Sequence, residues 1–357
     1  MAKFTKPPLI KEGDYIGLIA PSDGILDKKE IEKSMRIVEK WGLKIKLGKY
    51  VFAKEKDRYV ALPQEKQEDL RLMIEDPEIK IIWSVYGGYS ANDVLPVFNK
   101  QIIEKLKNNP KWFIGYSDIS LILNTLSSYK ILNIHGPNFV GLSELTEDSI
   151  NYLKKILFEG KIEEIDSSHK WSVLIPGEAE GIILASNLES LIFNLGTRFD
   201  PILHGKDDLI LAIEDIFVEK SAIARMIDTL LNHKKAHRIK GLILGRFVGI
   251  YEADYSYKYQ KTSYEKIIES RIKNKKDIVL VKLEEFGHSI FSLEENLIQK
   301  IFQRKKEKKE IKMLRKIKPK NNYLLIEPIQ ERTTKSGIVI PEVANLERPI
   351  MMGKIVS

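Results

Sequence analysis

The sequence predicts an α/β fold with a parallel sheet, and three observations support this prediction. Short apolar runs, each about the length of a strand, alternate with longer stretches in which apolar residues recur at helical spacing. The apolar runs end in glycine, proline or serine, which is typical of strands that pass into a turn. At 357 residues the chain is long for one domain and sufficient for two.

The first part of the chain follows this alternation in order. The expected strands are residues 15–20, 44–47, 79–85 and 112–114, with a further strand end at 132–137. The expected helices are residues 27–41, 63–76 and a helix from 119, whose apolar residues fall on one face.

The helix–strand rhythm weakens between residues 162 and 177, and we expect a domain boundary near residues 161–172. The second part contains expected strands at 209–215, 239–246 and 278–283, and an expected helix at 221–232. The predicted domains are residues 1–165 and 166–299, followed by a basic linker at 300–316 and a β-rich tail at 317–357.

Composition excludes several functional classes. The absence of cysteine excludes disulfides, thiolate metal sites and cysteine nucleophiles. The first 14 residues contain no secretory apolar segment and no apolar run is long enough for a membrane span, so we expect a cytoplasmic protein without membrane association. The net charge is +8, and residues 300–320, with eleven Lys or Arg and two Glu, contribute +9, so the remaining residues sum to −1. No recognition motif accompanies this basic tract. This pattern argues against sequence-specific nucleic-acid binding.

The stretch from Phe113 to Ser120 contains the first candidate for chemistry. An apolar run meets Gly115, then Ser117 and Asp118, and a helical pattern follows. Such a turn can expose a serine oxygen at the carboxyl end of a strand, above a helix N-terminus that favours negative charge. The alternative is that Ser117 or Asp118 simply caps the helix, because both residue types are favoured caps.

Other polar residues and glycines also fall at strand ends. Because ligands bind outside the carboxyl ends of parallel strands, we expect 21–22 and 87–88 to lie near Ser117. His135 follows another strand and is either a base or a core histidine. In the second part, 214–215 is a pair of acids that either caps the next helix or orients a histidine, and His288 follows a strand and a glycine. Serine, acid and histidine in this order indicate a serine hydrolase.

Several stretches in order resemble the LD-carboxypeptidase family, serine peptidases with a Ser-Glu-His triad that include the microcin C immunity peptidases. The resemblance covers about residues 7–289. The stretches are K-E-G-D-Y-I-G-L-I-A-P-S, Y-G-G-Y-S-A-N-D-V-L-P, N-P-K-W-F-I-G-Y-S-D-I-S, H-G-P, L-A-I-E-D, K-G-L-I-L-G-R-F and F-G-H-S.

The resemblance implies a fold and a set of site residues. The fold would be an N-terminal Rossmann-like domain and a C-terminal mixed β/α domain, paired as a homodimer. Ser117 would be the nucleophile, Glu214 the orienting acid and His288 the general base. The backbone N–H groups of Gly88 and Asp118 would form the oxyanion hole. The expected substrate contacts are Gly87, Tyr89 and Asn187.

The activity implied is hydrolysis of an L-to-D peptide bond that releases terminal D-alanine from muropeptide tetrapeptides, without a metal or organic cofactor. The alternative within the same family is a microcin-immunity-type peptidase acting on peptidyl-nucleotide analogues. A third possibility is an idle peptidase-like adaptor, which would be favoured if His288 were held out of hydrogen-bond reach of Ser117.

The chain departs from the family pattern in two places. The family's G-G-N-L appears as Ala185-Ser186-Asn187-Leu188, which alters a point of close backbone approach. After His288 the family's T-L-P-x-G-like tract is replaced by residues 290–295. We therefore expect the segment that supports His288 in the family to be missing or remodelled in this chain.

The last 40 or so residues resemble the first half of the small co-chaperonin barrel. This resemblance implies a chaperonin contact through residues 333–341. Alternatively, the tail supplies β-strands to the peptidase body in place of the missing closing strands, because three strands without partners would leave exposed edges.

Overall fold

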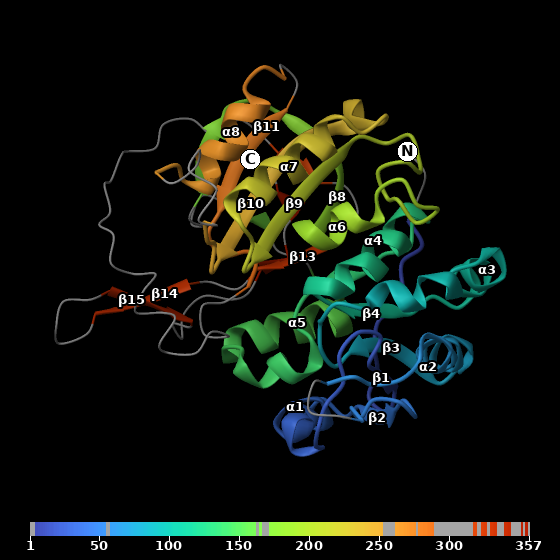
Figure 1. The fold of residues 1–357 in the computed structure, drawn as a ribbon. Coiled ribbons are helices and arrows are strands. Elements are labelled where there is room, and N and C mark those ends of the chain that lie inside the picture. The colour runs from blue at the N-terminus through green and yellow to red at the C-terminus, as the bar shows by residue number, and fades with distance from the viewer. Residues whose placement is uncertain are drawn as a thin grey trace.

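The computed structural model describes residues 4–54, 58–161, 171–252, 261–275 and 278–288, together with the backbone of short strands at 164–165 and between 317 and 355. Two sheets organise the molecule, one above the other in Figure 1. The expected α/β fold is confirmed, with a parallel sheet first and a mixed sheet second.

The first five strands of the chain form a parallel part of the first sheet, in the order β5-β4-β3-β1-β2. Helices α1 and α5 lie on one face, and α2 and α3 on the other (Figure 1). The elements are β1 (Tyr15–Ile19), α1 (Lys29–Lys40), β2 (Lys44–Leu47), α2 (Pro63–Glu75), β3 (Ile79–Ser84), η1 (Ala91–Val97), α3 (Lys100–Asn108), β4 (Trp112–Gly115), η2 (Ser117–Ile119), α4 (Ser120–Ser128), β5 (Ile134–His135), η3 (Phe139–Glu144) and α5 (Glu147–Glu159).

Local sequence signals explain where these helices begin and end. Pro63 is the first residue of α2, where its missing N–H is no loss, and the Glu65 carboxylate accepts the Leu62 N–H at 2.8 Å. The Thr146 hydroxyl accepts the Ser149 N–H at the start of α5. Gly160 ends α5 in the left-handed conformation, with φ +68°.

The second sheet has the order β8-β9-β10-β11-β7, parallel except for β7, which runs antiparallel to β11. Apolar residues of α6, α7 and α8 pack on one face of it. The elements are β7 (Trp171–Ile175), β8 (Ala179–Asn187), α6 (Leu188–Asn194), β9 (Leu209–Ile216), α7 (Lys220–Leu231), η4 (Ala236–Arg238), β10 (Ile239–Val248), α8 (Tyr264–Ile272) and β11 (Val279–Leu283).

Short strands of the tail pair with both sheets. Strand β12 (Ile317–Pro319) runs parallel to β8, and β13 (Tyr323–Ile326) runs parallel to β5. The other tail strands are β14 (Ile329–Thr333), β15 (Val339–Val343), β16 (Met351–Met352) and β17 (Lys354–Ile355), of which β17 pairs with β6 (Glu164–Ile165). Strand β12 thus extends the second sheet, and β13 with antiparallel β16 extends the first, whereas β14 and β15 pair with each other. The predicted linker at 300–316, the altered tract at 290–295 and most of the predicted chaperonin contact lie outside the described residues.

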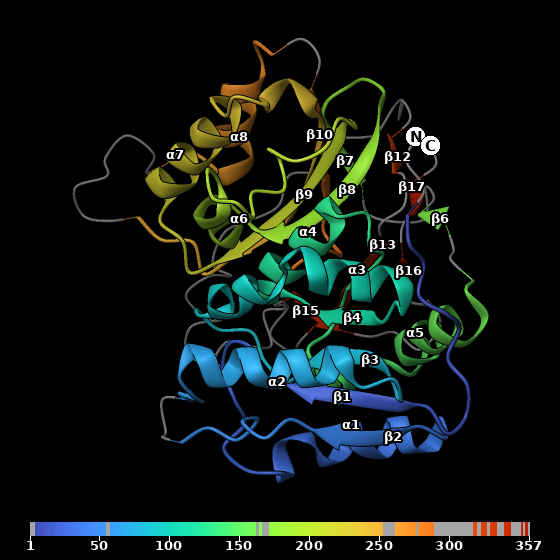
Figure 2. The ribbon, with the colours of Figure 1, turned by 90° about the vertical axis from the view of Figure 1, so that its right-hand side faces the viewer.

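Helix α4 lies between the two sheets in both ribbon views (Figures 1 and 2). The Ser120 and Ser186 hydroxyls are 2.9 Å apart, and the Asn124 amide donates to the Ala185 carbonyl at 3.2 Å. An ion pair between Lys130 and Asp207 adds a third contact between the two halves. The helix that follows Ser117 is therefore fixed against strand β8 of the second sheet.

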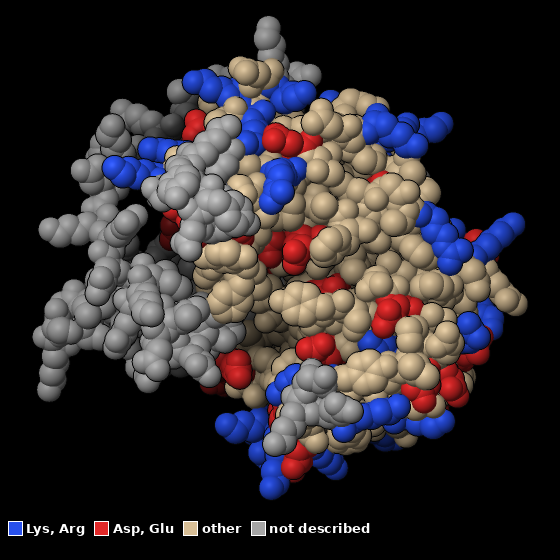
Figure 3. Space-filling model, viewed as in Figure 1, with Lys and Arg blue, Asp and Glu red and all other residues tan. Residues whose placement is uncertain are grey.

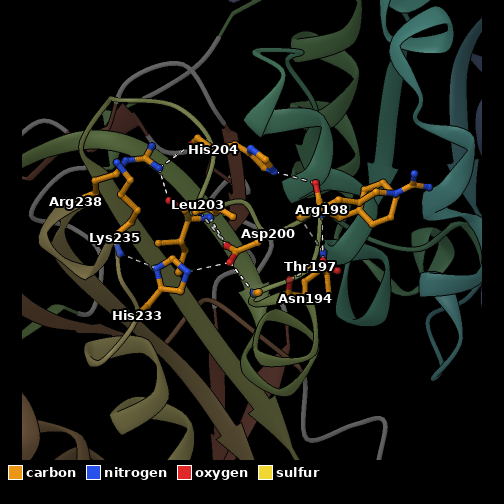
Figure 4. Close-up of polar contacts among 12 residues, drawn as sticks. Asn194, Thr197, Arg198, Asp200, Leu203, His204, His233, Lys235 and Arg238 are labelled. Atoms are coloured by element: carbon orange, nitrogen blue, oxygen red, sulfur yellow. Dashed lines mark hydrogen bonds and ion pairs between the residues drawn. The ribbon is translucent and has the colours of Figure 1, made fainter.

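A buried aspartate holds the loop between α6 and β9 (Figure 4). Asp200 is fully buried and accepts the N–H groups of Gly196 at 2.8 Å, Ile202 at 2.9 Å and Leu203 at 3.0 Å. The His233 Nε2–H donates to the same carboxylate at 2.9 Å. Because the neighbouring Phe199 packs against the apolar core of the first sheet, this loop forms part of the contact between the two halves.

We expect Asp200→Asn to lower the free energy of unfolding by about 3 kcal/mol, because an amide NH₂ would face buried N–H donors and leave them unpaired. His233 cannot compensate by changing tautomer, since its Nδ1 already accepts the Lys235 N–H. Urea denaturation measures the effect, with Asp208→Asn at an exposed position of the same loop as the control. Equal stability of the two variants would show that the buried network contributes nothing.

Candidate active site

Ser117 lies on a sharp turn between β4 and α4. Its backbone has φ +62°, the left-handed region that non-glycine residues seldom occupy. A Cβ atom on Gly115 would lie 2.6 Å from the Ile119 side chain, so the turn requires a residue without a side chain two positions before the serine. The hydroxyl is thereby exposed at the carboxyl end of the strand, as the sequence predicts.

Three side chains from distant parts of the chain are connected by consecutive hydrogen bonds. Ser117 Oγ is 3.1 Å from His288 Nε2. The other ring nitrogen of His288 hydrogen-bonds to Glu214 Oε2, which also accepts the His288 backbone N–H at 3.1 Å. The structure therefore brings together the three residues predicted as nucleophile, base and orienting acid.

Glu214 is fully buried at the end of β9. Burial raises the pKa of Glu214, but the His288 imidazole and the hydrogen bonds from His288 outweigh it and hold the pKa below its ordinary value. The acid is therefore ionised at neutral pH, as is required to fix the tautomer of His288 and to stabilise its protonated form.

The loop that carries His288 is braced by strand β10. Gly287 has φ +104°, and a Cβ there would lie 2.7 Å from the Cβ of Glu214. The Arg246 backbone N–H donates to the Phe286 carbonyl at 2.7 Å, and its guanidinium donates to the Gly287 carbonyl. The described part of the chain thus holds the imidazole within reach of Ser117 through β10.

The loop after β3 packs against the turn that carries Ser117. Gly88 has φ +138°, and a Cβ there would lie 2.3 Å from an Asp23 carboxylate oxygen. The Asp118 carboxylate accepts the Ser22 hydroxyl at 2.6 Å and the Ala91 N–H at 2.8 Å. Burial raises the pKa of Asp118. The Asp118 side chain therefore links the segments that follow β1 and β3 to the turn that carries Ser117.

These contacts show that the helix-cap interpretation of 117–118 is wrong. Neither η2 nor α4 has a side-chain cap hydrogen bond. The Ser117 hydroxyl is engaged with His288, and the Asp118 carboxylate with Ser22 and Ala91, because the tight turn directs both side chains away from the helix N–H groups.

The two acids at the end of β9 have different partners. Glu214 contacts His288, whereas Asp215 accepts the Asn187 amide at 2.8 Å and the Glu189 N–H at 3.0 Å. Neither caps α7, whose first turn is capped by the Glu219 carboxylate. Burial and the charge of Glu214 raise the pKa of Asp215 to about 7.

A cleft of about 400 Å³ opens beside Ser117. Two aromatic side chains at this cleft are largely exposed, Tyr89 at 84% and Phe193 at 70%. The lining residues are Gly88, Tyr89, Asn92, Ser117, Asp118, Leu121, Asn187, Glu189, Ser190, Phe193, Asp215 and Ile216.

Each predicted substrate-contact residue lies at or next to this cleft. Tyr89 and Asn187 line it, and Asn187 is oriented by Asp215 and by the Ser190 N–H at 3.1 Å. Gly87 lies behind Ser117, where an added Cβ would be 3.0 Å from the Ser117 Cβ. The predicted oxyanion residues Gly88 and Asp118 also line the cleft.

Models of the LD-carboxypeptidase N-terminal and C-terminal domains match residues 16–136 and 180–293. The chain belongs to the LD-carboxypeptidase family. It is therefore a serine-type carboxypeptidase, a hydrolase. The two matches lie on either side of the predicted domain boundary at 165/166, and neither includes the tail, so the co-chaperonin resemblance stays a prediction.

Two of the relatives of this chain are named for murein peptides. The chain is 30% identical over 247 residues to a probable murein peptide carboxypeptidase of Bacillus subtilis, covering 68% of this chain and 75% of the relative. It is 28% identical over 242 residues to a murein tetrapeptide carboxypeptidase of Pseudomonas aeruginosa, covering 65% and 76%. These relatives connect the family to peptidoglycan.

Solved structures share its fold. The microcin C7 self-immunity protein MccF in its apo state superposes with a TM-score of 0.64 at 19% identity, covering 80% of this chain and 90% of that one. A muramoyltetrapeptide carboxypeptidase from Oxalobacter formigenes gives a TM-score of 0.60 at 21% identity, covering 77% and 89%.

Sequence reasoning missed several residues that support the LD-carboxypeptidase site. Asn138 accepts the Tyr116 N–H at 3.3 Å, and Arg246 braces the His288 loop. Buried Lys66 contacts the Ser90 hydroxyl at 2.8 Å and Asp93 at 3.2 Å, next to the loop of Gly88. Asn138 directly follows the stretch H-G-P, and Arg246 lies within the stretch G-R-F. Their place in these recognised stretches is the one sequence signal that could have indicated them.

The described residues give three further observations, on surface charge, on membrane spans and on metal ligands. On the face shown in Figure 3, Lys and Arg lie mainly around the periphery and acidic side chains closer to the centre. Within the described residues no helix has the length and hydropathy of a membrane span, and no group of three or more His, Asp or Glu is arranged to hold a metal ion.

Proposed function

We propose that this carboxypeptidase hydrolyses an L-to-D peptide bond and releases terminal D-alanine from muropeptide tetrapeptides. The observation that carries the proposal is the Ser117–His288–Glu214 line beside an open cleft, with 3.1 Å between the serine oxygen and the imidazole. The murein peptide names of the curated relatives support this substrate class.

In this proposal, Ser117 attacks the scissile carbonyl while His288 Nε2 takes its proton. Glu214 keeps the other ring nitrogen protonated and stabilises the imidazolium that forms. The backbone N–H groups of Gly88 and Asp118 would hold the oxyanion. His288 then gives its proton to the leaving D-alanine amine, and a water molecule, deprotonated by His288, hydrolyses the acyl-enzyme.

We also propose Gly87, Tyr89 and Asn187 as substrate contacts, a homodimer as the assembly and the cytoplasm as the compartment, as expected from the sequence. Tyr89 and Asn187 line the cleft from opposite halves of the chain. A peptide bound there would therefore touch both halves.

A second candidate is a peptidase for peptidyl-nucleotide analogues. One solved neighbour is MccF in complex with adenosine monophosphate, at 19% identity. The exposed rings of Tyr89 and Phe193 offer faces on which a nucleobase could stack. The idle-adaptor alternative is disfavoured, because His288 lies within the hydrogen-bond range of Ser117.

The test follows D-alanine release from a muramoyl tetrapeptide by the purified full chain. We expect Ser117→Ala to lower kcat by at least ~10³-fold, because alanine has no hydroxyl with which to attack the scissile carbonyl. Ser128→Ala at the other end of α4 is the matched control and should retain activity. Absence of release by the folded wild type would contradict the proposal, and peptidyl-adenylate analogues would then be the next substrates.

A further inference from the structure

His135 is a second histidine next to the proposed triad. It is 5% exposed on β5 and pairs with Gly115 of β4, two residues before Ser117. Its ring centre is 5.6 Å from that of Phe286, two residues before His288. His135 therefore touches both segments that carry the nucleophile and the base, although the proposed mechanism gives it no role.

The hydrogen bonds of His135 define its tautomer. It bonds to the Ala185 backbone carbonyl on β8, and Nδ1 has no partner among the described residues, so Nε2 carries the hydrogen. Burial lowers the pKa of His135 to about 4, although the charge of Glu214 opposes this. The ring is therefore neutral at pH 7, and its Nδ1 is a buried acceptor.

Glu214 also has a buried acceptor oxygen, Oε1, that receives no hydrogen bond from the described residues. Its Oε2 receives both hydrogen bonds from His288, whereas Oε1 is buried and has no donor in the described part of the chain. Ala185, the anchor of His135, pairs with Ala212, which lies two residues before Glu214 on the same face of β9. The two groups are coupled electrostatically, because the Glu214 carboxylate opposes the lowering of the His135 pKa and a protonated His135 would lower the pKa of Glu214.

Each of these two buried acceptors requires a donor, because an unsatisfied buried acceptor is strongly unfavourable. A water molecule has two hydrogens and commonly links buried polar groups that cannot reach each other directly. We propose that a buried water donates one hydrogen bond to His135 Nδ1 and one to Glu214 Oε1, which makes His135 a positioning residue for the Glu214–His288 pair. The inference rests on the proposed roles of these two residues.

The link has a direct consequence for the reaction. A carboxylate held only through Oε2 can rotate about its last side-chain bond, whereas one held at both oxygens stays in line with the imidazole. His135 thereby fixes the acid, and through it the imidazole, in the orientation that lets Nε2 accept the Ser117 proton.

Two substitutions separate this role from a purely structural one. His135→Gln keeps an N–H near the Nε2 position for the Ala185 carbonyl but offers no acceptor at the Nδ1 position. His135→Asn offers an oxygen near Nδ1 but loses the donor to Ala185. We expect the Gln variant to keep its Tm and lose about tenfold in kcat with KM unchanged. We expect the Asn variant to have a lower Tm and a higher kcat than the Gln variant.

His237→Gln at an exposed position of η4 is the control. A Gln variant with wild-type kcat would overturn the proposal and leave His135 as a structural anchor. A crystal structure of the wild type tests the link without any substrate. Water density within about 3.2 Å of both His135 Nδ1 and Glu214 Oε1 would support it, and apolar packing between these atoms would overturn it. This observation stands even if the muropeptide assignment fails.

Discussion

Glu214→Gln should lower kcat by about 10³–10⁴-fold while the protein stays folded. The glutamine fits the same space, but its amide N–H can face the ring nitrogen of His288 that now donates to Glu214 Oε2. That arrangement favours the tautomer with its hydrogen on Nε2, 3.1 Å from the Ser117 oxygen. An imidazole in this tautomer cannot take the serine proton.

D-alanine release measures kcat, and circular dichroism checks the fold. Glu284→Gln is the matched control, since its side chain is 45% exposed on the same loop as His288. A Glu214→Gln variant within tenfold of wild type would show that His288 does not depend on the acid.

The same variant should also change the pH dependence of stability. Because Glu214 has a folded-state pKa below its ordinary value of 4.5, the unfolded chain binds a proton first as the pH falls. The contribution of the carboxylate to stability is therefore present above pH 4.5 and is lost below it. The free energy of unfolding of the wild type should accordingly fall more steeply below this pH than that of the variant.

Much of the fold could be predicted because buried parallel strands are continuous apolar runs. The strands expected at 79–85 and 209–215 are observed as β3 and β9, with one residue fewer in the first and one more in the second. The helices expected at 27–41 and 63–76 are observed as α1 and α2, shorter by one to three residues. Alternation of such elements is enough to predict the class of fold.

What could not be predicted depends on long-range packing. Strand β7 pairs with β11 more than 100 residues later, and no local pattern specifies that antiparallel edge. Helix α5 was not predicted, although Thr146 and Gly160 mark its two ends. The contact between Ser22 and Asp118 joins residues 96 positions apart, so neither side chain reveals it in the sequence.

The acids at 214–215 illustrate a part of the site that the residues alone could not predict, namely which of the two contacts the histidine. The sequence left open whether these acids cap a helix or orient a histidine. Successive side chains of a strand point to opposite faces, so one of the pair faces His288 and the other faces the start of α6. The resemblance assigned the role to Glu214, and the geometry brings that residue to the imidazole.

Gly88→Ala should lower kcat by about 10²–10³-fold, the effect of removing one oxyanion-hole donor. The backbone of Gly88 has φ +138°, which an alanine rarely adopts, and the added Cβ would lie 2.3 Å from Asp23 Oδ1 and 2.6 Å from Ser22 Oγ. The loop must then move, and the Gly88 N–H moves with it. Because Ser22 also bonds to Asp118, the displacement reaches the turn of Ser117.

Two other glycines separate the possible causes of such a loss. Gly13 has φ +91° with nothing within 4 Å of an added Cβ, so Gly13→Ala measures backbone strain alone. Gly141 has neither a positive φ nor a neighbour within 4 Å, so Gly141→Ala should be close to wild type. If Gly88→Ala and Gly13→Ala lose similar stability but only the first loses kcat, the loss of activity arises from the position of the Gly88 N–H. Wild-type kcat in a folded Gly88→Ala variant would remove this loop from the proposed oxyanion hole.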